Sequence, residues 1–383
     1  MNSQDLQSIG NKPQKVALVH DFLVSYGGAE RVFQAMAEMF PEAPIYTLLA
    51  DPLLVERYFP GRDIRQSWVG KLPAFLKKRY RFLLPFFPAA IETLDLREFD
   101  LVLSSSGAWS KGIVTRLNTK HIAYLHSPMR YAWDYHEKYL TELKSRGRMK
   151  LFTRMILSYL RVWDRQAAER PDFLLVNSKY TEARIKKYYR REAEVIYPGA
   201  LALYEGTLKR VQGEQKMRNH FLVVSRLTRS KKVDTAVEAF NKLGLPLIIV
   251  GEGPERKKLE AIAKDNTKFV GYQSDEELAK LYSAARAVIF PSEEDFGMVA
   301  VEALSFGTPV IAFEYGGIRE IVKEGVTGEL YHAETPEILA EGVRRFLAKE
   351  GGYDMSGMKA SVARFSSENF RKSLEEFIAT HTS

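Results

Sequence analysis

Four charged residues in the second half of the sequence stand where parallel α/β domains place ligand-binding groups. Arg226 and Lys231 lie in "RLTRSKK", just after the strand-like run "HFLVVS", and Glu294 and Glu302 flank a predicted helix start in "EEDFGMVAVE". Cations bind phosphate, and carboxylates accept hydrogen bonds from hydroxyl groups. The pattern predicts a site for a ligand that carries both groups. The alternative for the basic run is a solvated loop.

Backbone groups at the same helix start extend this predicted site. Phe296, Gly297 and Met298 open the helix, where unpaired N–H groups and the positive end of the helix dipole can face ligand oxygens. Gly297 permits close backbone approach. The alternative is that the acidic residues only favour a helix N-terminus. We accept this for Glu293 and Asp295, and expect a ligand contact for Glu294.

The first half of the sequence offers a second group of candidates. Gly27 and Gly28 stand between a predicted strand and a predicted helix, so their backbone can approach a phosphate. His126 ends the apolar strand "HIAYLHS". Taken alone, a "GG" pair is more often a plain turn, and a single histidine at a strand end is more often structural. His20 and Asp21 end the first strand and are predicted to line the floor of a cleft.

The elements that position these residues alternate between strand and helix. "KVALVHDF", a helix over 29–40 and "APIYTLLA" open a β-α-β pattern, and "FDLVLSSS", "HIAYLHS" and "FLLVNSK" are apolar runs that end in polar residues, as buried parallel strands do. From about residue 220 the alternation restarts. We therefore predict an α/β fold of two Rossmann-like, doubly wound parallel-sheet domains facing a central cleft. The predicted ranges are 1–205, 206–365 and a closing C-terminal helix over 366–383.

Several classes of protein are disfavoured by what the sequence lacks. "SYGG" and "VGEGPE", which holds Gly251 and Gly253, are incomplete as dinucleotide fingerprints, and no phosphate-loop motif occurs. Cysteine is absent, as are Asp-x-Asp and any histidine pair at metal-ligand spacing, so we expect no cofactor and no metal. No apolar run is long enough to span a bilayer, and the polar N-terminus lacks the apolar core of a secretory signal. The expected location is cytoplasmic.

The net charge of +8 is concentrated in the first half. Residues 1–200 carry +10 and residues 201–383 carry −2. Residues 62–81 and the run "KSRGRMKLFTRMILSYLRVWDRQAAER" interleave cations with aromatic and aliphatic residues. Such segments can lie on an anionic membrane surface, or they can be ordinary helices with solvated cations. No recognition module accompanies the charge, so nucleic acid is not expected as a partner.

Taken as a set, the motifs resemble the retaining glycosyltransferases of family 4, which have the GT-B fold. "EDFGMVAVE" matches the family's E-x-F-G-x-x-x-x-E pattern, "SRLTRSKKVDTAVEAF" looks like its phosphate clamp, and "IIVGEGPERKKLE" and "HDFLVSYGGAERV" look like its base-side turn and N-terminal glycine loop. "YLHSPMRYAWD" and "FDLVLSSS" are similar to a bacterial subgroup that makes surface polysaccharides, several of whose members are mannosyltransferases. One departure is Lys232, where the family usually has glycine after the clamp lysine.

The resemblance implies a role for each candidate residue. Glu294 and His126 would contact the transferred sugar, Glu302 would accept from the ribose hydroxyls, and Arg226 and Lys231 would hold the diphosphate in place of a metal ion. Glycines 27, 28, 251, 253 and 297, with Phe296 and Met298, would bind the donor through their backbone. Arg130 and Asp134 are the candidates for acceptor contact.

The resemblance also implies an activity, which is retaining transfer of a hexose in the synthesis of a bacterial O-antigen, capsule or exopolysaccharide. The implied donor is GDP-mannose and the implied acceptor is a saccharide on undecaprenyl diphosphate, at the inner face of the cell membrane. Three alternatives stay open: a UDP-sugar donor, a nucleotide-sugar epimerase or phosphorylase of the same fold, and a non-catalytic interaction protein at the membrane face.

Overall fold

The computed structural model describes residues 14–77, 80–142, 147–200 and 218–382. It consists of two compact units, one formed by Met1–Pro198 with Phe370–Ser383 and the other by Gly199–Asn369. The boundary predicted at residues 205 and 206 lies outside the described residues. The predicted closing helix is present as α15 (Ser367–His381), and from Phe370 onward its residues belong to unit 1. We describe each unit by itself.

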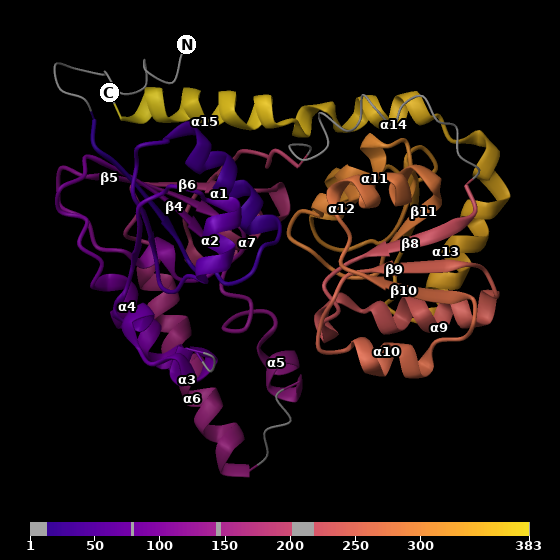
Figure 1. The fold of residues 1–383 in the computed structure, drawn as a ribbon, viewed down its shortest axis with the longest axis horizontal. Helices are drawn as coiled ribbons and strands as arrows, with labels where there is room; N and C mark the ends of the chain where they lie inside the picture. Colours follow the sequence, from indigo (N-terminus) through magenta and orange to yellow (C-terminus); the bar gives the residue numbers. More distant parts are fainter. Residues whose placement is uncertain (1–13, 78–79, 143–146, 201–217, 383) are drawn as a thin grey trace. The chain divides into compact units, whose positions relative to one another are not determined.

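Unit 1 is built on a seven-stranded parallel sheet in the order β3-β2-β1-β4-β5-β6-β7 (Figure 1). Its strands are β1 (Val16–His20), β2 (Ile45–Thr47), β3 (Ile64–Gln66), β4 (Leu101–Ser106), β5 (Lys120–Leu125), β6 (Phe173–Val176) and β7 (Glu194–Val195). The helices are α1 (Gly28–Met39), α2 (Pro52–Tyr58), α3 (Ala74–Lys77), α4 (Phe87–Glu92), α5 (His136–Glu142), α6 (Gly147–Ala167) and α7 (Lys179–Tyr189), with 3-10 turns at η2 (Trp68–Lys71), η3 (Tyr80–Phe86) and η4 (Ser110–Gly112).

The central strands of unit 1 form where the sequence predicted them. β1, β4 and β5 are almost wholly buried, because helices cover both faces of the sheet, and this explains why they read as continuous apolar runs. Among its described residues, the basic segment over 62–81 contains β3 and the short helices η2 and α3.

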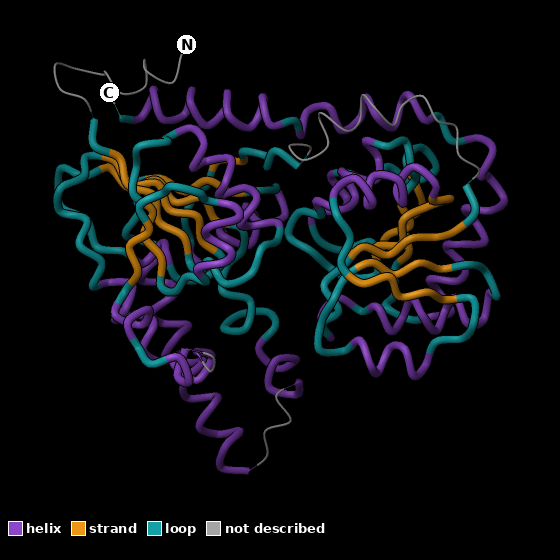
Figure 2. The backbone as a smooth tube through the Cα atoms, in the orientation of Figure 1, coloured by secondary structure: helices purple, strands orange, loops and turns teal. Residues whose placement is uncertain are grey.

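Unit 2 repeats the architecture with six parallel strands in the order β10-β9-β8-β11-β12-β13 (Figure 2). They are β8 (His220–Val224), β9 (Leu247–Val250), β10 (Thr267–Gly271), β11 (Ala285–Phe290), β12 (Val310–Phe313) and β13 (Gly328–Tyr331). The helices are α9 (Val233–Leu243), α10 (Arg256–Ile262), α11 (Asp275–Ala284), α12 (Met298–Ser305), α13 (Pro336–Lys349) and α14 (Met355–Val362), with 3-10 turns at η5 (Arg229–Lys231), η6 (Gly317–Glu320), η7 (Glu350–Gly352) and η8 (Ala363–Phe365).

In both units the chain order reverses beside the first strand. β1 lies between β2 and β4, and β8 lies between β9 and β11. Loops that leave such neighbouring strands in opposite directions open a crevice at the carboxyl ends of the strands, where ligands of doubly wound sheets bind. The predicted fold of two Rossmann-like parallel-sheet domains is confirmed, and the candidates Arg226, Lys231 and Glu294 follow β8 and β11 at the switch point of unit 2.

Candidate functional site

Lys231 and Glu294 meet at the switch point of unit 2. Lys231 ends η5 after β8, Glu294 lies in the loop after β11, and their Nζ and Oε1 atoms are 2.6 Å apart. The hydroxyl of Ser292 lies 3.4 Å from the same carboxylate oxygen. Both charged side chains are a little under one third exposed, so solvent, and therefore a ligand, can reach them. The two residues are 63 positions apart in sequence and are brought together because β8 and β11 are neighbours.

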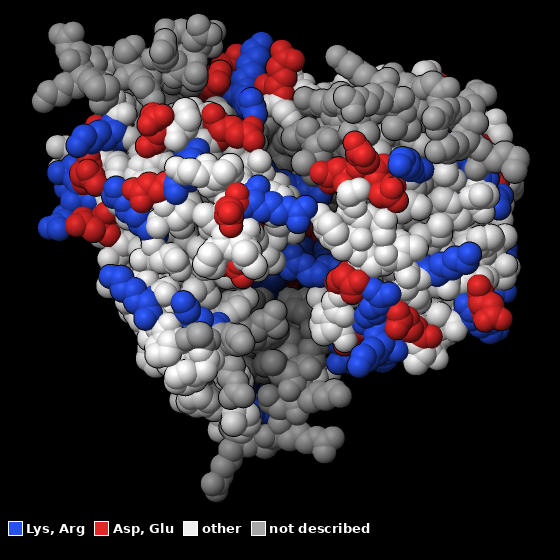
Figure 3. Space-filling model, viewed as in Figure 1, with Lys and Arg blue, Asp and Glu red and all other residues white. Residues whose placement is uncertain are grey.

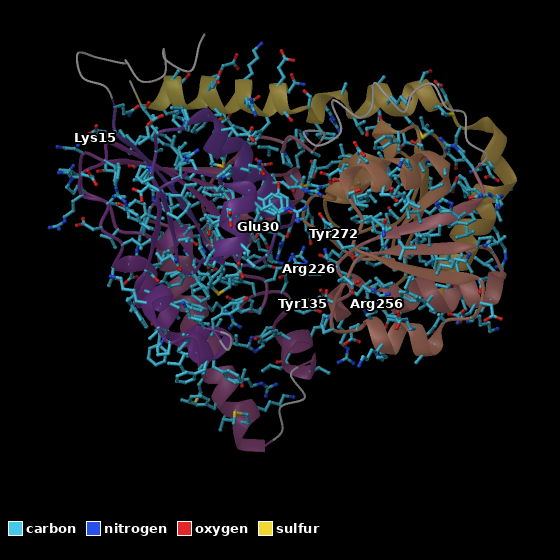
Figure 4. All side chains as sticks on the ribbon, viewed as in Figure 1. Lys15, Glu30, Tyr135, Arg226, Arg256 and Tyr272 are labelled. Atoms are coloured by element: carbon cyan, nitrogen blue, oxygen red, sulfur yellow. The ribbon has the colours of Figure 1, made fainter. Side chains whose placement is uncertain are left out.

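Arg226 is the exposed cation of this group, and Figure 4 labels it in the loop that follows β8. Within the described part of the chain, its guanidinium takes part in no hydrogen bond or ion pair, whereas its backbone carbonyl accepts from the hydroxyl of Ser225. An uncommitted guanidinium in the same loop as a committed lysine suits the binding of a phosphate.

Lys232, where the resemblance expects glycine, adopts the left-handed conformation with φ +51° and ψ +33°. This region favours glycine because a Cβ crowds the following carbonyl. Lys232 therefore adopts a conformation that glycine favours, at the expense of strain, and its side chain forms an ion pair of 3.3 Å with Glu334.

The start of α12 is shaped by two residues of the predicted site. Gly297 is the N-cap with φ +108°, a conformation that L side chains rarely adopt, and it offers no side-chain cap to the helix. The ring of Phe296 is buried and packs edge-on against Phe365 at 5.2 Å. Phe296 therefore anchors the loop, and ligand contact by the backbone of Phe296, Gly297 and Met298 stays a prediction.

Glu302 lies one turn further along α12 and is only 1% exposed. Its Oε2 accepts a hydrogen bond of 2.7 Å from the hydroxyl of Tyr282, which is itself buried. The carboxylate thus has a structural partner in addition to the ribose role that the resemblance implies, and that role stays a prediction.

Close backbone packing explains the glycines after β9. A Cβ on Gly251, which has φ +127°, would meet the carbonyl oxygen of Ser225 at 1.9 Å, and one on Gly253 would meet that of Leu227 at 2.2 Å. The Gly251 N–H donates to the carbonyl of Gly271. These glycines bring the loops after β8 and β9 into contact, and their direct contact with a donor stays a prediction.

The sequence reasoning missed a glycine pair that supports Glu294. A Cβ on Gly316, with φ +93°, would meet the Glu294 carbonyl oxygen at 2.1 Å, and the Gly317 N–H donates to that oxygen at 2.9 Å. The loop after β12 therefore holds the backbone of Glu294, whereas Lys231 contacts its side chain. The available signal was the glycine pair in "EYGG" directly after an apolar strand.

In unit 1, the strand ends bring His20 and His126 to one hydroxyl group. Ser105 Oγ lies 2.8 Å from His126 Nε2 and 3.1 Å from His20 Nδ1. His126 is half-buried, and its ring packs edge-on against Tyr124. Burial raises the pKa of Tyr124 well above its usual value, so its phenol stays protonated and donates to the carbonyl of Ile196. Ser105 was another residue that the sequence reasoning missed.

The predicted glycine loop begins α1. Gly27 is the N-cap and Gly28 the first helical residue, and the Gly27 N–H donates to Glu30 Oε2 at 2.8 Å. The Glu30 side chain therefore already occupies one of the N–H groups that the sequence offered to a phosphate. Figure 4 labels Glu30 on α1.

Two further candidates have structural partners. Asp21, expected on the floor of a cleft, accepts hydrogen bonds of 2.6 to 3.0 Å from the backbone N–H groups of residues 107–110, so it positions that loop. Both oxygens of Asp134 contact the buried Arg184, at 2.7 and 2.8 Å. Arg130 is half-buried on the same loop. Acceptor contact by Arg130 and Asp134 stays a prediction.

Among the described residues, no three histidine, aspartate or glutamate side chains gather closely enough to hold a metal ion. None of the described helices combines the length and the apolar character that crossing a bilayer requires.

Both halves of the chain match known protein families. Residues 26–200 match the family model described as Glycosyltransferase Family 4, and residues 205–361 match the model described as Glycosyl transferases group 1. An uncharacterized glycosyltransferase of Methanocaldococcus jannaschii is 34% identical over 175 residues, which are 42% of this chain and 44% of that protein. The D-inositol 3-phosphate glycosyltransferase of Corynebacterium urealyticum is 29% identical over 247 residues, 56% of this chain and 58% of that protein. The chain thus spans about half the length of the curated relatives it matches.

Solved structures of the same architecture cover nearly the whole chain. Anabaena HepE in complex with UDP and glucose has a TM-score of 0.67 at 20% identity, covering 96% of this chain and 100% of that one. Sucrose-phosphate synthase from Thermosynechococcus elongatus has a TM-score of 0.67 at 22% identity, covering 96% and 98%. At these identities the likeness concerns the fold, which is GT-B.

Proposed function

We propose that this chain, which carries a glycosyltransferase family 4 domain followed by a group 1 glycosyl transferase domain, transfers a hexose from a nucleotide sugar to a saccharide acceptor with retained configuration. One observation carries the proposal: Lys231 and Glu294 lie in contact beside the exposed Arg226 and the glycine-capped start of α12. Cations and helix N–H groups suit a diphosphate, and a carboxylate suits sugar hydroxyls.

The chemistry follows from where charge develops. As the sugar leaves, negative charge grows on the diphosphate, and Arg226, Lys231 and the positive end of α12 stabilise it. Glu294 holds the sugar hydroxyls and, through its contact with Lys231, holds that lysine in place. We propose that these groups replace a divalent metal ion and that transfer needs no cofactor. Glu302 accepts from the ribose, and His126 contacts the sugar near its reacting carbon.

For the donor we propose a UDP-sugar first and GDP-mannose second. UDP and UDP-glucose are bound by HepE, a protein of the same fold, and this favours uridine as the base. GDP-mannose rests on the resemblance of "YLHSPMRYAWD" and "FDLVLSSS" to the mannosyltransferase-containing subgroup. The two donors differ in base and sugar, so binding and transfer assays separate them.

A lipid-linked acceptor is supported by one surface of unit 1, the α6 stripe. Six apolar side chains along α6 are each more than half exposed: Met149, Leu151, Phe152, Met155, Tyr159 and Val162. The opposite side of α6 packs into the core through Leu157 and Leu160. Helix α6 is therefore apolar on both sides, which a helix surrounded by water would not be.

Neighbouring segments extend the α6 stripe. Phe75, Phe82 and Phe86 are more than half exposed on or beside α3 and η3, and η3 packs against the same core cluster as α6. The cations Lys150, Arg154 and Arg165 accompany the stripe, with Arg154 paired to Glu137 and Arg165 to Glu169, and the described atoms at the lower end of unit 1 are mostly uncharged (Figure 3). Apolar side chains flanked by cations suit the interface of an anionic membrane. We propose peripheral attachment to the inner face of the cell membrane, where a saccharide on undecaprenyl diphosphate is available as the acceptor.

The donor site is tested by thermal stabilisation of the full chain with UDP, GDP, ADP, UDP-glucose and GDP-mannose, without and then with Mg²⁺. A ligand that binds the native state raises Tm. Arg226→Ala should weaken the binding of the stabilising nucleotide about ten- to a hundredfold, the cost of a charge-assisted contact. Arg229→Ala, in the same loop, is the matched control and should bind as the native chain does. If the nucleotide still raises Tm in the double variant Arg226→Ala with Lys231→Ala, the proposed donor site is contradicted.

Transfer is tested with the donor so identified and a membrane lipid extract as the acceptor source. Glycosyl transfer predicts labelled sugar in the lipid fraction and its loss in Glu294→Gln. Sugar conversion without any acceptor would favour the epimerase, and full biological activity of a chain lacking Glu294, Arg226 and Lys231 would favour a non-catalytic interaction protein.

Membrane attachment is tested by co-sedimentation with vesicles of anionic and of neutral lipid. Met155→Asp should reduce binding to anionic vesicles several-fold, because it places a carboxylate in the middle of the stripe. Leu117→Asp, at a fully exposed loop position, is the matched control and should bind normally. Equal binding of the two variants would refute a role for the α6 stripe.

A further inference from the structure

The three central strands of unit 1 place His20, Ser105 and His126 on one face of the sheet. His20 and Ser105 are register partners on β1 and β4, and Ser105 is paired with Tyr124 on β5. Because side chains alternate along a strand, His126 follows Tyr124 on the same side. The hydroxyl of Ser105 thus lies between two imidazoles, at 3.1 Å from His20 Nδ1 and 2.8 Å from His126 Nε2.

A serine hydroxyl between two imidazoles couples their tautomers. It has a single proton, so it donates to one ring nitrogen and accepts from the other. If Ser105 donates to His20 Nδ1, it accepts the Nε2 proton of His126, and the proton-accepting nitrogen of His126 is then Nδ1. If Ser105 instead donates to His126 Nε2, it accepts the Nδ1 proton of His20, and the proton of His126 is then on Nδ1.

Glu30 selects between these arrangements. Its Oε1 lies 3.8 Å from His20 Nε2, and the two side chains are 14% and 3% exposed. Its Oε2 accepts from the Gly27 N–H, which fixes the carboxylate, and the His20 ring is stacked on Phe33 at 4.6 Å. A carboxylate at this position favours the proton on His20 Nε2. His20 Nδ1 is then an acceptor, and Ser105 donates to it.

We infer that Glu30, His20 and Ser105 form a positioning chain that keeps the proton of His126 on Nε2 and leaves Nδ1 as its acceptor nitrogen. The backbone of His126 is held as well, because its N–H donates to the Ser106 carbonyl and its carbonyl accepts from Asn177. The role of this nitrogen toward a sugar or acceptor hydroxyl rests on the proposed function, whereas the tautomer does not. Glu30, His20 and Ser105 are positioning residues, since they act through His126.

The tautomer is measured by long-range ¹H–¹⁵N NMR of the seven histidine rings in the full chain, assigned with His126→Gln and His20→Gln. The expected result near neutral pH is His126 protonated at Nε2. Ser105→Ala should shift His126 toward a mixture of tautomers, and Glu30→Gln should do so to a smaller extent. His126 protonated at Nδ1 in the native chain, or unchanged in Ser105→Ala, overturns the inference.

The chain also provides a matched control, Ser104→Ala. Ser104 is the preceding residue of β4, equally buried, and its hydroxyl lies 2.8 Å from His121 Nε2 on the other face of the sheet. The substitution Ser104→Ala removes a hydroxyl group from the same strand. It should therefore lower stability as Ser105→Ala does, while the His126 signals stay unchanged. An equal response of His126 to both substitutions would show that its signals report a general disturbance of the strand. That result would refute the proposed positioning chain of Glu30, His20 and Ser105.

Kinetics test the consequence for transfer. Ser105→Ala and Glu30→Gln should lower kcat about tenfold or more, part of the roughly 10²- to 10⁴-fold that a positioned proton acceptor contributes, with donor KM little changed. Ser104→Ala should keep native kcat. If no donor supports transfer, the proposed function fails while the NMR result still decides the tautomer. If transfer occurs and kcat is equal in all three variants, the positioning role is refuted.

Discussion

The ion pair between Lys111 and Asp164 allows a quantitative test of how unit 1 is held together. Lys111 Nζ lies 2.6 Å from Asp164 Oδ1, and the side chains are 1% and 0% exposed. The other oxygen of Asp164 accepts from Trp133 Nε1 and from the Tyr189 hydroxyl, each at 2.7 Å. Lys111→Met keeps most of the side-chain volume but leaves a buried carboxylate without its counter-charge.

The expected loss follows from this burial. Removing one partner of a buried pair costs about 3 to 5 kcal/mol, because the remaining charge stays desolvated. With a urea dependence of about 2 kcal/mol per molar, the midpoint should fall by about 1.5 to 2.5 M. The double variant Lys111→Met with Asp164→Asn should recover more than half of the loss, since a neutral amide oxygen can still accept from Trp133 or Tyr189.

The assay is urea unfolding followed by tryptophan fluorescence. All four tryptophans of the sequence, at positions 68, 109, 133 and 163, lie in unit 1, so the signal reports that unit alone. Arg97→Met, which breaks a largely exposed pair with Asp95, is the control and should leave the midpoint unchanged. A shift below about 0.5 M for Lys111→Met, or a double variant no more stable than the single one, would refute the reasoning.

Three further predictions concern titration and backbone conformation. Burial lowers the pKa of His121 to about 3, so below about pH 6 the unfolded chain binds a proton that the folded unit does not. As the pH is lowered from about 6 to about 4, the unfolding free energy of the native chain should therefore decrease by about 1.4 kcal/mol per pH unit more than that of His121→Gln. Urea unfolding at each pH measures this difference. Lys232→Gly should be about 1 kcal/mol more stable than Lys232→Ala, because both lose the same ion pair and only glycine relieves the positive φ; equal calorimetric stability would contradict the strain. Gly251→Ala should lower the unfolding free energy of unit 2 by about 3 kcal/mol or more, since its Cβ would meet a carbonyl oxygen at 1.9 Å. Gly244→Ala, with nothing within 4 Å of its Cβ, should lower it by only about 1 kcal/mol in the same calorimetric scan.

The sequence predicted the strands that are buried on both faces, together with the edge strand β10, and missed the edge strands β3 and β7. β1, β4, β5, β8, β9 and β11 are central and read as apolar runs. β3 is three residues long with two exposed side chains, and β7 has two residues, so neither shows a strand pattern. Edge strands are protected by being short and polar, which also hides them from a reading based on hydrophobicity.

The candidate site of unit 2 could be predicted as a set of residues, but its contacts could not. Arg226, Lys231 and Glu294 were identified from residue type and position after strands. The 2.6 Å contact between Lys231 and Glu294 depends on β8 lying beside β11, with the intervening strands β9 and β10 on the other side of β8. The order of strands within a sheet is a long-range property that local patterns do not carry.

The two serine–histidine pairs of β4 show what else separates a candidate residue from a functional one. Ser104 with His121 and Ser105 with His126 have the same contact distance of 2.8 Å, and the alternation of the strand sends them to opposite faces. His121 is fully buried with its pKa lowered to about 3, so it stays neutral and serves the core. His126 is half-buried at the strand end, and its pair continues through His20 to the carboxylate of Glu30. Position along the strand, rather than residue type, therefore makes one pair structural, and a role of the other pair in transfer stays a prediction.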